Sequence, residues 1–131
     1  MGFPEKEMAI TTILVVSDIE KSKNWYTNVL GASMYREYGG SSVVLQFLEH
    51  WLLIVSEGEP TADKPDVYFS RPDNPNRVSH AFTIRVKDCQ KSYEELKDRG
   101  AEFISPPYDH GYEIRCFFRD PDGHLFEISQ A

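Results

Sequence analysis

The sequence lacks several features that mark well-known protein classes. Its 131 residues include only two cysteines, Cys89 and Cys116, which give neither a disulfide framework nor a CxxC pair. No apolar run is long enough to cross a bilayer, and the first residues lack a basic segment followed by an apolar one. We therefore expect a cytoplasmic protein with reduced thiols and no membrane partner.

Positive charge is also scarce. Lysine and arginine total 14 against 21 aspartates and glutamates, a formal net charge of −7 at pH 7. Domains that bind nucleic acid present a basic surface, so this balance argues against such a partner and favours a neutral or cationic ligand. The GxSxG, P-loop and GxGxxG motifs are absent, which leaves hydrolase, NTPase and dinucleotide-binding functions without support.

The first half of the chain has the pattern of one strand, one helix and three strands. Residues 9–16 form a β-branched run of strand length. Ser17 and Glu20 predict a capping box for the amphipathic helix that follows, and Gly31 predicts its left-handed end. Further strands are predicted at residues 34–38, 43–48 and 51–56.

The second half repeats this pattern. Asp18-x-x-Lys21-Ser22, Gly31-Ala32 and His50 recur in order as Asp88-x-x-Lys91-Ser92, Gly100-Ala101 and His124. We predict one domain over residues 1–131, with βαβββ modules at 8–56 and 80–130 and a proline-rich linker at 57–79. Neither module has enough core to stand alone, so their sheets are expected to join around a shared cavity.

Two stretches carry a family resemblance. VSDIEKSKNWYTNVLG at residues 16–31, together with DPDGHLFEI at residues 120–128, resembles the vicinal oxygen chelate superfamily. That group includes glyoxalase I, extradiol dioxygenases, fosfomycin-resistance enzymes and bleomycin resistance proteins. The resemblance implies a glyoxalase/bleomycin-resistance-like α+β fold, in which two tandem βαβββ modules form curled mixed sheets around a shared cleft, usually completed in a homodimer.

In the enzymes, the resemblance also implies a divalent metal such as zinc, iron, manganese or nickel. Its ligand positions, on the first and last strands of each module, fall here on Thr11, Leu53, Ala81 and Glu127. Leucine and alanine cannot ligate a metal and threonine is a poor ligand, so one carboxylate remains. Strand alternation turns His80 to the opposite face unless a bulge brings it back. We predict no metal cofactor; a metal, if present, would use Glu127 and His80.

The expected cleft is mostly apolar, with a few polar groups. Such walls suit a small organic ligand, and aromatic side chains with an acidic balance favour an aromatic or cationic compound. The predicted ligand-binding residues are Thr11, Trp51, Thr83, Arg85, Tyr112, Phe117, Leu125 and Glu127. The alternative is that Arg85 and Glu127 pair and the cavity is packed shut.

These observations leave three functions open. The leading hypothesis is a metal-free, homodimeric protein that binds a small molecule between its modules, as the resemblance to bleomycin-resistance-type members implies. The second is a metal-dependent, glyoxalase-like lyase or a dioxygenase that uses Glu127 and His80. The third is a degenerate, non-catalytic dimer module. No catalytic residue is assigned, and the residues alone do not decide whether the protein is an enzyme.

Overall fold

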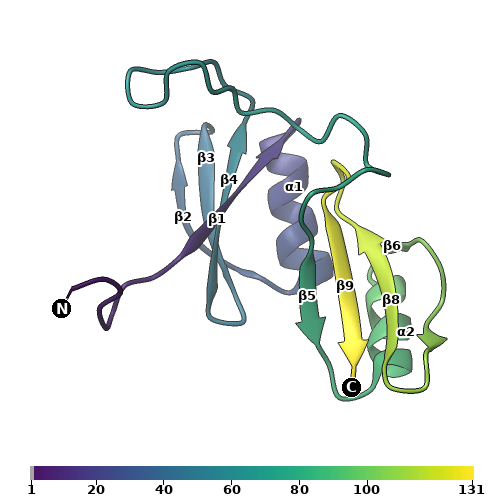
Figure 1. Ribbon diagram of the computed structural model, residues 1–131. Helices are drawn as coiled ribbons and strands as arrows, with labels where there is room; N and C mark the ends of the chain where they lie inside the picture. The colour runs from purple at the N-terminus through teal and green to yellow at the C-terminus, as the bar shows by residue number, and fades with distance from the viewer. Residues whose placement is uncertain (1) are drawn as a thin grey trace.

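The computed structural model describes residues 2–131, which form two mixed sheets and two α-helices (Figure 1). The first module contains β1 (Thr11–Val16), α1 (Ile19–Trp25), the π-helix η1 (Tyr26–Leu30), β2 (Ser33–Tyr38), β3 (Ser42–Phe47) and β4 (His50–Ser56). The second contains β5 (Phe82–Arg85), α2 (Cys89–Asp98), β6 (Glu102–Phe103), β7 (Tyr108–Asp109), β8 (Ile114–Arg119) and β9 (Leu125–Gln130). The predicted α+β fold is confirmed, with β7 as an unpredicted short strand.

Both sheets have the same mixed connectivity. The first has the strand order β1-β4-β3-β2, and the second has the order β5-β9-β8-β6 with β7 added on β8. In each module the first strand runs parallel to the last, and the remaining pairs are antiparallel. This pairing places Thr83 opposite Glu127 on one side of β9, and Phe117 opposite Glu127 on the other.

The helix ends follow from short-range chemistry, with two corrections. Asp18 and Asp88 are the N-caps, and each carboxylate accepts the backbone N–H three residues later, at 3.1 and 3.0 Å. The predicted capping box at Ser17 is therefore wrong by one residue, because the N-cap is Asp18 and its carboxylate accepts the N–H of Lys21. The single helix predicted up to Gly31 widens into a π-helix over its last five residues before Gly31 ends it at φ 87°.

The two modules share one hydrophobic core. In Figure 1, α1 lies between the two sheets. Trp25, at the end of α1, packs with its ring centroid 6.2 Å from that of Phe118 and 6.1 Å from that of Phe126. The core combines first-module residues such as Leu14 and Ile54 with these second-module aromatics. Each sheet therefore turns one face toward a common interior, and its other face points away from it.

A buried polar chain also joins the modules. The Tyr26 hydroxyl donates to Oδ2 of Asp120 at 2.6 Å. The other oxygen of Asp120 accepts the N–H groups of Asp122 at 2.9 Å and His124 at 2.8 Å. Nε2 of His124 lies 2.9 Å from the carbonyl oxygen of Val15 on β1. The DPDG turn of the second module is thereby tied to both β1 and the helix of the first. Burial raises the pKa of the Asp120 carboxyl and of the Tyr26 hydroxyl.

Candidate functional site

The candidate site lies on the face of β9 that points away from the core. Phe126 and Ile128 are in the core, so alternation places Leu125, Glu127 and Ser129 on the opposite side of the strand. We call this side, with the matching sides of β5 and β8, the outer face of the second sheet.

The Glu127 carboxylate has two polar partners on neighbouring strands, which explains how it lies nearly buried among apolar residues. Its Oε1 accepts a hydrogen bond from the Thr83 hydroxyl at 2.7 Å, and its Oε2 lies 3.8 Å from Nε of Arg115. Arg85 does not pair with Glu127, because parallel register places it opposite Ser129, whose hydroxyl accepts from it at 2.9 Å. The alternative in which Arg85 pairs with Glu127 is therefore wrong, and Arg115 is the arginine that pairs with Glu127.

A second carboxylate, Glu113, completes this cluster. One of its oxygens accepts the Ser129 hydroxyl and lies 3.5 Å from Nη1 of Arg85. The other accepts Nη1 of Arg115 at 3.2 Å. The bond from Ser129, followed by the charges of the two arginines, lowers the pKa of Glu113 and favours its ionised form. We call the cluster the Glu–Arg network; its members are Thr83, Arg85, Glu113, Arg115, Glu127 and Ser129.

Sequence reasoning missed Glu113 and Arg115. Phe117 is the register partner of Glu127, and Glu113 and Arg115 precede Phe117 at alternate positions. Strand alternation therefore indicates that both side chains lie on the same face as Glu127. The guanidinium carbon of Arg115 lies 5.9 Å from the centre of the Phe117 ring, which places an apolar surface next to the network. The structure thus brings Thr83, Arg85, Phe117, Leu125 and Glu127 together on one face.

The other predicted residues lie elsewhere. Thr11 and Trp51 are register partners on β1 and β4. They lie on the side of the first sheet opposite the core residues Leu14 and Leu52, which we call the outer face of the first sheet. That face is apolar and open: Ile13 is 45% exposed, and Tyr35, which meets Trp51 edge-on at 5.1 Å, is 61% exposed. Because both outer faces point away from the shared core, one chain does not bring Thr11 and Trp51 to Glu127. Tyr112 is exposed in the loop before β8, outside the network.

The residues present do not fit a divalent metal. Within residues 2–131 there is no group of three or more His, Cys, Asp or Glu side chains that could hold one. Arg115 already places a positive charge beside Glu127 and would repel a metal ion there. His80 is exposed ahead of β5, in a cavity of about 390 Å³ between the linker and the start of β9.

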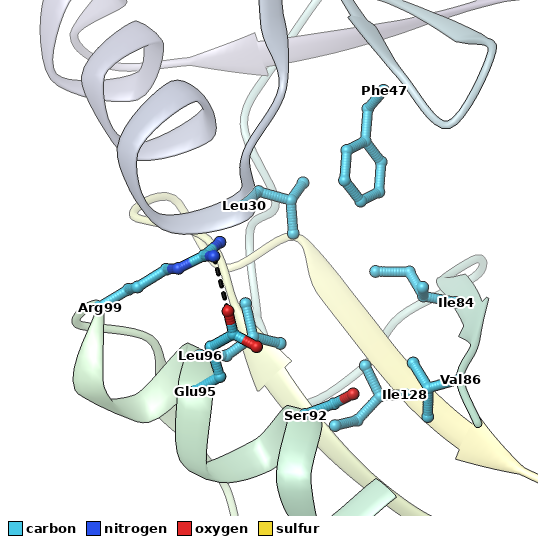
Figure 2. A pocket seen from close by; sticks show the side chains of 9 residues that line it. All are labelled: Leu30, Phe47, Ile84, Val86, Ser92, Glu95, Leu96, Arg99 and Ile128. Atoms are coloured by element: carbon cyan, nitrogen blue, oxygen red, sulfur yellow. Dashed lines mark hydrogen bonds and ion pairs between the residues drawn. The ribbon is translucent and has the colours of Figure 1, made fainter. Parts of the chain in front are cut away.

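A separate cavity lies at the seam between the modules, on the core side. Figure 2 shows Leu30 and Phe47 of the first module facing Ile84 of the second. Its volume of about 150 Å³ is below the roughly 300 Å³ that small-molecule sites usually offer. At its edge, Arg99 of the second module donates to the carbonyl oxygen of Val29 at 3.3 Å. We assign this cavity to module packing.

Paired βαβββ modules with mixed sheets and one shared core define a glyoxalase-like fold. The chain belongs to the Glyoxalase/Bleomycin resistance protein/Dioxygenase superfamily, whose family model matches residues 9–128. The resemblance in the two sequence stretches is thereby confirmed. Over residues 2–131, no helix has the length and apolar character needed to span a membrane.

Named relatives cover several activities. The chain is 29% identical over 123 residues to a lactoylglutathione lyase of Neisseria meningitidis, covering 91% of this chain and 87% of that protein. It is 30% identical over 117 residues to biphenyl-2,3-diol 1,2-dioxygenase 2 of Rhodococcus globerulus. That match covers 88% of this chain but only 58% of the dioxygenase. A crystal structure of a glyoxalase/bleomycin resistance protein/dioxygenase from Nocardioides superposes with TM-score 0.74 at 21% identity, covering 96% of this chain and 84% of that one.

Proposed function

We propose that this protein binds a small molecule without a metal, on the outer face of the second sheet. The observation that carries the proposal is the Glu–Arg network. It combines ordered charged groups with Phe117 on an accessible sheet face, and ligand sites typically combine apolar walls with a few convergent polar groups. The ligand that fits this face has an aromatic or other flat apolar body.

We further propose that a second copy of the chain closes the site. The outer face of the first sheet is apolar, and Ile13 and Tyr35 on it are exposed. Apolar sheet faces of this kind are usually covered by a partner. In a homodimer, Thr11 and Trp51 of one copy would face Glu127 of the other, so that all the predicted residues except Tyr112 meet in one cleft. Two free buried thiols, Cys89 and Cys116, support a cytoplasmic location.

A metal-dependent lyase or dioxygenase is the second candidate, supported by the names of the relatives. It predicts near-stoichiometric zinc, iron, manganese or nickel in the purified, untagged protein, or ligand binding that requires one of these ions. Either result would overturn the metal-free proposal. The chemistry of Thr11, Leu53, Ala81 and Glu127, the positions that carry the ligands in the enzymes, favours the metal-free function.

The test is a thermal-shift screen of aromatic compounds, run with and without each metal. We expect at least one compound to raise the melting temperature of the metal-free protein, and Glu127→Gln to weaken that shift. Glu57→Gln is the matched control, because Glu57 loses the same charge in an exposed linker ion pair with Arg71. If no compound shifts the melting temperature and the protein remains a dimer, the non-catalytic dimer module becomes the better account.

A further inference from the structure

The two kinds of charge in the Glu–Arg network differ in accessibility. The side chains of Arg85 and Arg115 are 67% and 35% exposed, whereas those of Glu113 and Glu127 are 13% and 12% exposed. The carboxylates therefore lie beneath the guanidinium groups. A molecule that approaches the outer face of the second sheet meets positive charge first, although the network contains as many carboxylates as guanidinium groups.

The exposed arginines of the network also keep hydrogen-bond donors that no group in the described part of the chain uses. Glu127 accepts from Thr83 with Arg115 nearby, and Glu113 accepts from Ser129, Arg85 and Arg115. Within residues 2–131, by contrast, both arginines form their hydrogen bonds through Nη1 alone. Guanidinium groups carry further N–H donors on Nε and Nη2. The unused donors therefore lie on the more exposed arginines, whereas the remaining acceptor sites lie on the two nearly buried carboxylates.

The network also holds these donors in place. Arg115 lies between Glu113 and Glu127, with contacts of 3.2 and 3.8 Å, and Arg85 is held by Ser129. Binding through groups that are already ordered costs less conformational entropy. Guanidinium groups match the paired oxygens of carboxylates and phosphates. Phe117 lies next to Arg115 and offers an apolar surface to the rest of the ligand.

We infer that Arg85 and Arg115 recognise the anionic group of a small organic ligand, a carboxylate or a phosphate ester on an aromatic or apolar body. The inference rests on the proposed function and names its ligand class. It replaces the cationic alternative that the acidic composition favoured, since a cation would meet the exposed guanidinium groups before either carboxylate. The whole-chain charge and the local charge of this face have opposite signs.

The test compares benzoate, phenyl phosphate, benzyl alcohol and benzylamine, which share a phenyl ring and differ in charge. Binding is measured by NMR titration of the arginine Nε–H resonances and by calorimetry. We expect both anions to shift the signals of Arg85 and Arg115 and to bind about tenfold or more tightly than benzyl alcohol, because charge-assisted bonds are added. Benzylamine is expected to be the weakest. The two anions distinguish a carboxylate preference from a phosphate preference.

Arg85→Gln is the informative variant, because this exposed side chain can be changed with little effect on folding, which the NMR spectrum checks. It should lose most of the preference for anions, and Arg71→Gln, with the same charge loss in the linker, should keep it. If benzylamine or benzyl alcohol binds this face as well as the anions do, the inference is wrong and the proposed function stands. If none of the four compounds perturbs the face, both are wrong.

Discussion

Asp120 offers the sharpest test of how the modules are joined. Replacing it with alanine leaves three donors without an acceptor: the buried Tyr26 hydroxyl, the buried N–H of His124 and the partly buried N–H of Asp122. Each such group costs about 1–3 kcal/mol, and removal of the desolvated charge returns part of that sum. We expect Asp120→Ala to lower the free energy of unfolding by about 3–5 kcal/mol.

Asp120→Asn separates hydrogen bonding from charge. The amide oxygen can still accept both N–H groups, and the amide nitrogen can donate to the Tyr26 oxygen. We expect a loss of only about 1 kcal/mol for this variant. The exposed linker residue Asp73, changed to alanine, is the matched control and should leave stability unchanged.

The assay is urea unfolding at fixed protein concentration, followed by tryptophan fluorescence. Trp25 reports on this region, because its ring centroid lies 4.8 Å from that of Tyr26. The pKa of Asp120 is raised in the folded protein, so the folded state binds the proton of this carboxyl more tightly than the unfolded state does. The stability that comes from this proton is fully present below the usual pKa of 3.8 and is lost as pH rises through the raised pKa of the folded state. Wild type should therefore gain stability relative to Asp120→Asn between neutral pH and about pH 4. A loss below about 1 kcal/mol for Asp120→Ala, or equal losses for both variants, would refute this reasoning.

Three further predictions concern other parts of the molecule. Gly123→Ala should destabilise the fold by about 1–3 kcal/mol in chemical unfolding, because Gly123 has φ +95° and a Cβ there would lie 2.9 Å from Cβ of Pro75. Gly58→Ala is the control, because a Cβ at residue 58 would meet no atom within 4 Å. Cys89 and Cys116 should react with iodoacetamide near pH 8 only after unfolding, because burial raises the pKa of both thiols, that of Cys116 to about 12. Rapid labelling of the native protein, detected by mass spectrometry, would contradict this. Ile13→Glu should convert a dimer to a monomer in sedimentation velocity, whereas Val67→Glu in the linker should not; a dimer that survives Ile13→Glu would place the interface elsewhere.

The elements were predictable because short-range chemistry sets them. The β-branched run before Asp18 forms β1, the first helix begins one residue later than the predicted Ser17 cap would place it, and Gly31 ends that helix in the left-handed conformation expected. The family resemblance added the pairing of the two modules. The widening of the helix from Tyr26 onward was not predictable in this way, because α- and π-helical turns share the same apolar stripe and tertiary packing selects between them.

The site was only partly predictable. Alternation along β9 is enough to place Glu127 and Leu125 on a face opposite Phe126, as the structure has them. Alternation does not say whether that face looks toward the other module or away from it, because this depends on how the two sheets pack. Alternation backward from Phe117 reaches Arg115 and Glu113 but not Tyr112, which has the opposite parity and lies in the loop before β8.

The shared core has a consequence for how a chain of two similar modules can change. Positions that build the core or cap the helices still match between the halves, as Asp18 matches Asp88 and Gly31 matches Gly100. The positions on the outer faces have diverged, so that Leu53 stands where the other half has Glu127. Packing restrains mutations inside the molecule far more than on its two outward surfaces. Each half can therefore acquire a different surface chemistry while the fold that holds both surfaces remains the same.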